Sequence, residues 1–386
     1  MGKIKLFKAS SFYDQYLNYF FTNNFKWKDQ SYNELKASMF YDSFGLSDCI
    51  KSSLECTGGY DVYDSIVNSE ALQLKWAKEN NLKLPNNKIQ ILKEVLQAQI
   101  LEFQPDILFA HDNALIDAIF LKRIKSLCPS IRLVMAYDGV AFCDKDKFKE
   151  VDLMLTCVSY IKDYYLRNGL RSEVFHYGFN KDVLGRLTSS KKNLYNVSFV
   201  GGLNLMSGGH HKRLKVLSKL SGISPSYFIS SSCLEGHELF RWPQRKRILS
   251  GRIREAIQIS KVGKRNQGVC YGLEMFQALH DSKIALNVHI DNAKNSAANI
   301  RLFEATGVGA CLLTDWKENI QDFFEPDYEI VTFKSVDECL DKAKYLLENE
   351  TERDKIAAAG QKKTLENFTL QKRCDDLDLI IRKHLI

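Results

Sequence analysis

Short apolar segments alternate with amphipathic segments of helical length along nearly the whole chain. Between residues 106 and 139, for example, the apolar runs DILFAHD and IRLVMAYDG flank the helical pattern ALIDAIFLKRIKSLC. Apolar runs of this kind are typical of strands that are buried on both faces of a parallel sheet. Parallel strands need a crossover connection, which the helical segments supply. The pattern therefore predicts an α/β fold with a doubly wound, Rossmann-like parallel sheet.

The same pattern starts again near residue 195, where the run VSFVGGL ends in two glycines and further helix–strand pairs follow. A chain of 386 residues suits two domains of about 150–200 residues better than one. We therefore expect an N-terminal domain over 1–185, a C-terminal domain over 195–370, and a helix over 371–386 that packs back toward the N-terminal domain. Ligands of such sheets bind outside the carboxyl ends of the strands, so we expect two domains that face each other across a cleft.

Several classes of protein are disfavoured by what the sequence lacks. No GxGxxG or GxxxxGK[ST] motif follows a strand, which argues against a dinucleotide-dependent dehydrogenase and a P-loop kinase. The ten cysteines form no CxxC pair and no zinc-like cluster, so we expect reduced thiols and no metal. No apolar run approaches the roughly 20 residues that cross a bilayer, and the first residues lack a signal-peptide core. These features predict a cytoplasmic location.

Positive charge is concentrated in one part of the chain. The formal net charge is +7, and three basic stretches lie over 208–219, 241–254 and 261–267. Such a field suits an anionic ligand or a peripheral contact with an anionic membrane at its inner, cytoplasmic face. Ordinary solvated helix faces are the alternative interpretation. No nucleic-acid recognition motif accompanies these stretches, so we expect no nucleic-acid partner.

The stretch NIRLFEATGVGACLLTD, residues 299–315, combines features of an anion-binding turn. A small-residue loop precedes a helix predicted to start near Ile300, and the first N–H groups of a helix lack internal partners and attract anions. Arg301 offers a second anion contact, and Glu304 is placed to accept hydrogen bonds from a ribose diol. The alternative is that Glu304 is a solvated helix residue in an ordinary connection. The candidate binding residues of this stretch and its loop are Ser296, Ala298, Asn299, Ile300, Arg301 and Glu304.

The segment from Tyr271 to Phe368, which contains SAANIRLFEATGVGACLLTD, resembles the C-terminal domain of GT-B glycosyltransferases of the CgeB-like, group 1 type. VSFVGGL and QILEFQPDILF extend the resemblance over most of residues 60–375. The resemblance implies transfer of a sugar from a nucleotide-diphosphate sugar to a hydroxyl of a glycan, glycolipid or protein. It implies that the nucleotide lies on the C-terminal domain, the acceptor on the N-terminal domain, and that no essential metal or other cofactor takes part.

Particular residues match the family's donor site. Glu304 occupies the place of the second, ribose-binding Glu of the E-x7-E motif, while Ser296 stands where the first Glu would be. Retaining stereochemistry therefore does not carry over to this chain. By position, Gly201 and Gly202 would let the backbone approach the diphosphate, and Lys212 or Arg213 would neutralise the leaving group. The alternative for the two glycines is a simple turn, and the alternative for the two basic residues is an exposed helix start.

The N-terminal domain offers candidates for the base that deprotonates the acceptor hydroxyl. His111 and Asp112 follow one predicted strand, and Asp138 follows the next, where side chains would face a cleft. Turn and cap residues fill such positions as often, and Asp112 would cap a helix starting near Ala114. A nucleotide-sugar epimerase of the same fold and a non-catalytic nucleotide-sugar or glycan-binding protein are the rival functions.

Overall fold

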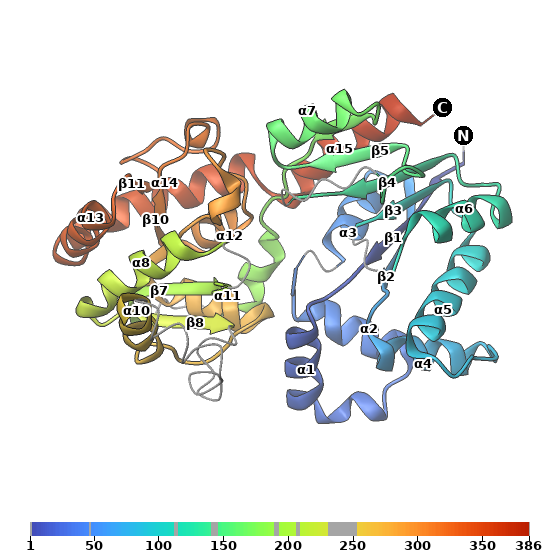
Figure 1. Ribbon diagram of the computed structural model, residues 1–386, viewed down its shortest axis with the longest axis horizontal. Coiled ribbons are helices and arrows are strands. Elements are labelled where there is room, and N and C mark those ends of the chain that lie inside the picture. Colours follow the sequence, from blue (N-terminus) through green and yellow to red (C-terminus); the bar gives the residue numbers. More distant parts are fainter. Residues whose placement is uncertain are drawn as a thin grey trace. The chain divides into compact units, whose positions relative to one another are not determined.

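The computed structural model describes residues 2–45, 48–111, 115–139, 146–188, 193–205, 209–230 and 253–385. The chain divides into two compact units (Figure 1). The first unit comprises Met1–Tyr177 and Leu370–Ile386, and the second comprises Gly178–Thr369. The N-terminal part of the first unit thus ends at Tyr177, whereas we expected the N-terminal domain to extend to residue 185. Within the described ranges, no helix is long and apolar enough to cross a membrane.

The first unit is built on a six-stranded parallel sheet with the order β2-β1-β3-β4-β5-β6. Its strands are β1 Ile4–Ser10, β2 Tyr60–Ile66, β3 Ile107–Ala110, β4 Leu133–Tyr137, β5 Leu153–Thr156 and β6 Ser172–Val174. Its helices are α1 Asp14–Asn23, α2 Tyr32–Tyr41, α3 Cys49–Cys56, α4 Glu70–Glu79, α5 Lys88–Phe103, α6 Ala118–Leu127, α7 Ser159–Arg167 and α15 Leu370–His384. The C-terminal helix α15 packs on α3, and the Tyr60 hydroxyl donates to Asp378 at 2.6 Å.

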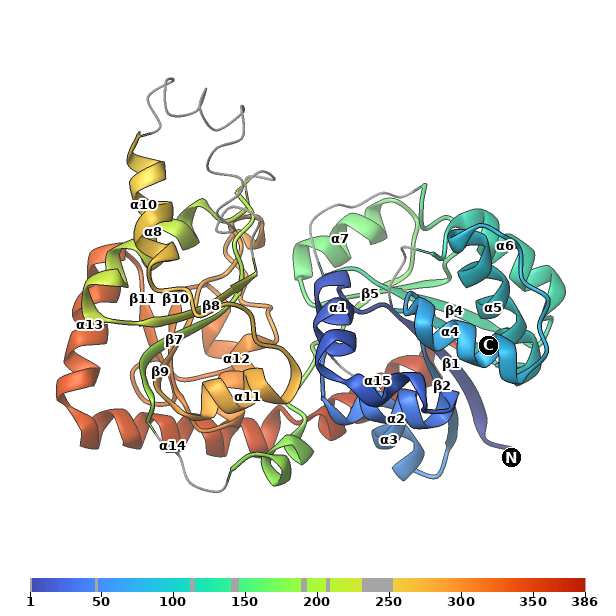
Figure 2. The same ribbon diagram turned by 90° about the horizontal axis from the view of Figure 1, so that it is seen from below.

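The second unit contains a five-stranded parallel sheet with the order β11-β10-β9-β7-β8. Its strands are β7 Tyr195–Gly202, β8 Ser226–Ser230, β9 Ser282–Asn287, β10 Cys311–Asp315 and β11 Val331–Phe333. Its described helices are α8 His211–Leu220, α10 Ile253–Gly263, α11 Gly272–His280, α12 Arg301–Gly307, α13 Val336–Glu348 and α14 Glu350–Asn367. Figure 2 shows α8 and α10 on one side of this sheet and α11 and α12 on the other. The predicted α/β class with two parallel sheets is confirmed.

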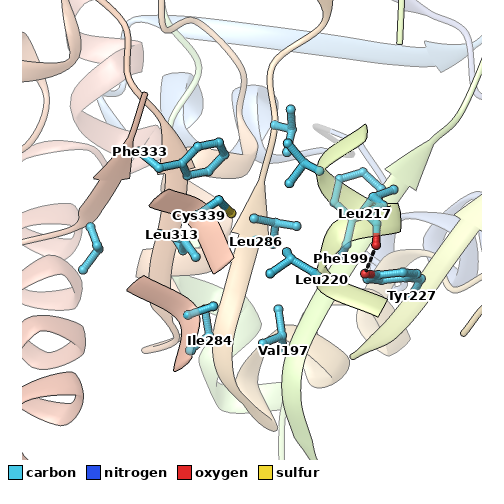
Figure 3. Close-up of a cluster of buried hydrophobic side chains, with 14 of the residues drawn as sticks. Val197, Phe199, Leu217, Leu220, Tyr227, Ile284, Leu286, Leu313, Phe333 and Cys339 are labelled. Carbon is cyan, nitrogen blue, oxygen red and sulfur yellow. Dashed lines mark hydrogen bonds between the residues drawn. The ribbon is translucent and has the colours of Figure 1, made fainter. Parts of the chain in front are cut away.

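The apolar strands of the second unit are buried on both faces, as their sequences predict, except for the edge strand β8, in which only every second residue is buried. In β7, Val197 and Phe199 join the core under α8, while Val200 joins the core under α11 and α12. Side chains alternate along a strand, so each face of the sheet takes every second residue. Figure 3 shows the first of these cores, where Leu217 and Leu220 of α8 lie over the side chains of β7, β9 and β10.

The junction of α12 with β10 is packed too tightly for any side chain at Gly307. A Cβ at this position would overlap the ring of Phe179, which is fully buried. We expect Gly307→Ala to lower the free energy of unfolding by about 1–3 kcal/mol, as overpacking does in cores. Chemical denaturation would measure the change. Gly222→Ala is the control, because nothing lies within 4 Å of a Cβ there; an equal loss in both variants would contradict the packing argument.

Candidate active site

The carboxyl ends of three neighbouring strands define the candidate site of the second unit. Strands β10, β9 and β7 are adjacent and parallel, so their carboxyl ends lie at one edge of the sheet. Gly201 and Gly202 end β7, His289 lies two residues beyond β9, and Asp315 ends β10. A ligand of a doubly wound sheet binds at this edge.

Asp315 is the centre of the polar network at this edge. Its carboxylate is fully buried and accepts the Nδ1–H of His289 at 2.7 Å and the backbone N–H of the same residue at 2.9 Å. The second oxygen contacts Lys212 Nζ at 2.9 Å and Lys317 Nζ at 3.6 Å. One carboxylate thus orients a histidine and two lysines. The Nε2 of His289 is buried and has no hydrogen-bond partner among the described residues.

The charge of Asp315 is fixed by these neighbours. Burial alone would raise the pKa of this carboxyl, but the hydrogen bonds from His289 and the positive charge of Lys212 hold the pKa well below its usual range. For Lys317, burial lowers the pKa, and the attraction of Asp315 opposes that shift. The network therefore carries a permanent carboxylate.

The two basic residues predicted to meet the leaving group occupy different environments. Arg213 is 8% exposed, and its guanidinium donates to the carbonyl oxygens of Gly202 at 2.5 Å and Val288 at 2.7 Å. Burial lowers the pKa of Arg213 to about 10. Its donors thus join the ends of β7 and β9, whereas the Lys212 side chain is 40% exposed and contacts only Asp315 among the described residues. Lys212 is therefore the cation that a ligand can reach.

The loop before α12 is held at the end of β9 and leaves backbone donors open. The side-chain amide of Asn299 donates to Asn287 at 2.7 Å, and the N–H of Ala297 donates to Asn319 at 2.6 Å. The N–H groups of residues 298–301 have no acceptor within the described ranges. Ser296 is half-buried, and its N–H donates to the carbonyl oxygen of Ala293 at 3.0 Å. The predicted open turn therefore consists of the four amides that follow Ala297.

Glu304 is buried in α12, so the interpretation of a solvated helix residue is wrong. Its side chain is 7% exposed, and Oε2 lies 2.8 Å from Nη1 of Arg301. The two groups are not aligned as a hydrogen bond, and this oxygen has no hydrogen-bond partner in the described part of the chain. Burial raises the pKa of Glu304, and Arg301 lowers it in part. A buried carboxylate with an unused acceptor is costly to keep unless a ligand supplies the donor.

The base candidates of the first unit lie at the carboxyl ends of β3 and β4. The His111 ring packs against the rings of Tyr137 and Tyr177, with centroid distances of 5.8 Å and 5.5 Å. Burial, with a smaller effect from Lys8, lowers the pKa of His111 to about 3, and both ring nitrogens lack a hydrogen-bond partner among the described residues. Asp138 is half-buried and accepts the hydroxyl of Tyr165 at 2.6 Å.

Asp112 lies outside the described residues, and the helix expected to start near Ala114 starts later. The helix α6 begins at Ala118, and the Asp117 side chain caps it by accepting the N–H of Phe120 at 2.7 Å. Within the described ranges, no group of three or more His, Cys, Asp and Glu side chains could hold a metal ion.

His289, Asp315 and Lys317 join the candidate site through their mutual contacts, and we did not predict them from the sequence. Both KIALNVHI and ACLLTD carry a polar residue at or just beyond the carboxyl end of a strand, as MAYDG does for Asp138. The rule that selected Asp138 could therefore have selected Asp315 and His289. Their mutual contact has no local sequence signal, because it joins two different strands.

Comparisons with known proteins agree with this architecture. Residues 217–378 match the family described as glycosyl transferase-like. No curated protein matches the chain. Among solved structures, a glycosyltransferase from Rickettsia africae ESF-5 is similar at 11% identity and a TM-score of 0.58, covering 100% of this chain and 99% of that one. Alr3699/HepE from Anabaena, solved with UDP-glucose, is similar at 11% identity and a TM-score of 0.58, with 98% and 100% covered.

Sucrose-phosphate synthase from Thermosynechococcus elongatus is similar at 8% identity and a TM-score of 0.54, with 99% of both chains covered. Likeness at such low identity concerns the fold, and the family match concerns residues 217–378, most of which lie in the second unit. The chain has the GT-B fold, and its residues 217–378 match the glycosyl transferase-like family.

Proposed function

We propose that the protein transfers a sugar from a nucleotide-diphosphate sugar to a hydroxyl of a glycan, glycolipid or protein acceptor. The family match and the likeness to a structure that holds UDP-glucose support a nucleotide-sugar donor. The observation that carries the proposal is the buried carboxylate of Glu304, whose Oε2 is ion-paired with Arg301 but accepts no hydrogen bond within the described ranges. A ribose diol supplies two O–H donors, which suit a carboxylate that has unused acceptor capacity.

The diphosphate would lie beside Glu304, at the open amides of residues 298–301 and the ammonium of Lys212. Consecutive unpaired N–H groups bind phosphate oxygens well. The exposed Lys212 side chain, held by Asp315 at 2.9 Å, would then neutralise the charge that develops on the leaving nucleotide. Gly201 and Gly202 at the end of β7 would leave room for the phosphates. With a cation supplied by the protein, transfer would need no metal and would continue in EDTA.

Asp138 suits the role of base better than His111 in this proposal. The lowered pKa of His111, about 3, makes its neutral ring a weak proton acceptor. Asp138 already receives a hydrogen bond from Tyr165, which orients its carboxylate. A protein base is needed if the reaction inverts the configuration of the sugar, whereas leaving-group oxygens would assist the attack if it retains it.

The role of Glu304 predicts a loss of nucleotide affinity that depends on the pentose. We expect Glu304→Gln to weaken binding of the ribonucleoside diphosphate by about 10- to 150-fold, because hydrogen bonds to charged groups contribute about 1.5–3 kcal/mol. The free energy of unfolding should stay the same or rise, because burial outweighs the attraction of Arg301 and raises the pKa of Glu304, so its ionised form destabilises the folded state. Calorimetry with UDP and GDP, and denaturation, would measure the two quantities.

The 2′-deoxy form of the nucleotide that binds is the matched probe. It should bind the wild type more weakly than the ribonucleotide, and this difference should vanish in Glu304→Gln, since the two changes remove the same contact. Glu348→Gln, at an exposed position on α13, is the control variant. If Glu304→Gln bound both nucleotides as the wild type does, Glu304 would have no role in the donor site.

Incubation of the protein with donor sugars tests the reaction itself. Transfer predicts a new glycoside only when a hydroxyl acceptor is present. A new isomer of the donor sugar in the absence of acceptor would indicate an epimerase instead. Nucleotide-sugar binding without any product across a panel of glycan, glycolipid and protein acceptors would favour a non-catalytic binding protein.

A further inference from the structure

A basic groove lies between α8 and α10 in the second unit, and the donor site does not use it. These two helices pack side by side, as Figure 2 shows. The groove has a volume of about 1040 Å³. Its charged lining consists of Lys215, Lys219, Arg254, Lys261, Lys264, Arg265 and Asp337. Six cations therefore share one groove with a single carboxylate.

Most of these cations are uncompensated. Lys219 pairs with Asp337 at 2.6 Å, and Nε of Arg265 donates to the carbonyl oxygen of Ser221 at 3.1 Å. The remaining four have no hydrogen-bond or ion-pair partner for their side chains in the described ranges: Lys215, Arg254, Lys261 and Lys264. Like charges that are held close together repel one another. The groove therefore attracts anions, and a bound anion relieves the repulsion among its cations.

The form of the groove favours an extended anionic surface over a single small anion. The side chains of these four cations are exposed, whereas a specific phosphate-binding site holds its cations in fixed, buried positions. Ile257, on the same helix as Arg254 and Lys261, is 51% exposed. An apolar side chain among cations is typical of a helix that lies on a membrane interface. Among the described residues that line the groove, no aromatic side chain offers a surface on which a nucleic-acid base could stack.

We propose that this basic groove binds the headgroups of anionic phospholipids and places the second unit on a membrane surface. The second basic stretch of the sequence, 241–254, lies outside the described residues except for its last two, so the proposal rests on the groove alone. Each Lys or Arg near such a surface strengthens binding by about 1 kcal/mol, or about five-fold, and salt weakens it. The inference does not depend on the identity of the donor or of the acceptor.

Flotation of the full chain with vesicles tests this proposal. We expect binding to vesicles of phosphatidylcholine with about 30% phosphatidylglycerol, and little binding to phosphatidylcholine alone. The double variant Lys261→Gln/Lys264→Gln should weaken vesicle binding by roughly 25-fold, because each lost cation weakens it by about five-fold. Lys355→Gln with Lys362→Gln, at exposed positions on α14, removes the same net charge and should have a much smaller effect.

Other outcomes would overturn the proposal. Equal losses in the two double variants would mean that net charge, and not the groove, attracts vesicles. Binding of tripolyphosphate or of a single-stranded oligonucleotide without binding of anionic vesicles would assign the groove to a soluble anion. Ile257→Ser should weaken vesicle binding but leave tripolyphosphate binding unchanged. The affinity for nucleoside diphosphates should be the same in Lys261→Gln/Lys264→Gln and in the wild type. A failure of the membrane proposal can therefore be distinguished from a failure of the donor-site proposal.

Discussion

Replacement of Lys212 by alanine is expected to lower the turnover number for sugar transfer by about 10²- to 10³-fold, the effect of losing one charge-stabilising donor. The reason is that Lys212 is 40% exposed and is held by Asp315 at 2.9 Å, whereas Arg213 is occupied by the carbonyl oxygens of Gly202 and Val288. Charge on the leaving phosphate grows in the transition state, so the loss should appear mainly in kcat. Initial rates over a range of donor concentrations separate kcat from KM.

Two variants make this expectation specific. Lys212→Arg keeps the charge at the start of α8 and should retain most of the turnover. Lys355→Ala removes an exposed lysine on α14 and should leave both constants unchanged. If Lys212→Ala raised KM and left kcat at the wild-type value, the lysine would bind the donor uniformly and would not assist the departure of the nucleotide.

The sequence of α8 alone predicts which of the two side chains, Lys212 or Arg213, points toward the core. Arg213 shares one face of α8 with Leu217 and Leu220, which are both buried. Residues four and seven positions apart lie on the same side of a helix, so the spacing alone indicates that Arg213 points toward the core. Lys212 is rotated by about 100° from that face. The sequence could therefore have separated the two residues, although it could not name the carbonyl oxygens that Arg213 meets.

The rest of the site depends on contacts between distant segments. The alternation of apolar runs predicted the strands whose carboxyl ends carry Asp138 and Asp315, because burial on both faces of a sheet leaves a local signal. The pairing of His289 with Asp315 joins residues 26 positions apart and follows from the register of β9 with β10. Likewise, nothing in the residues around His111 indicates that Tyr177 lies against its ring. Such contacts arise only when the sheet assembles.

Replacement of Asp315 by asparagine is expected to reduce the free energy of unfolding by about 3–5 kcal/mol, the loss typical of removing one partner from a buried ion pair. Asparagine fills nearly the same volume, so no cavity contributes. Lys212 can turn toward solvent, but the Lys317 side chain is 8% exposed and would remain as a buried cation without its carboxylate. Denaturation by urea at neutral pH would measure the loss. Asp337→Asn is the control, because that carboxylate is 78% exposed in its pair with Lys219 and should matter little.

The pH dependence of the same variant separates charge from packing. The pKa of Asp315 in the folded protein lies below the value of about 3.9 that an unfolded chain has. Its contribution to stability is therefore complete above about pH 5 and is lost as the pH falls toward the folded value, because the unfolded chain takes up the proton first. The difference in unfolding free energy between wild type and Asp315→Asn should accordingly be constant from pH 7 to about pH 5 and shrink at more acidic pH. A difference that stayed constant down to about pH 3 would mean that asparagine destabilises the site by its shape or hydrogen bonding, and that the carboxylate charge does not hold His289, Lys212 and Lys317 in place.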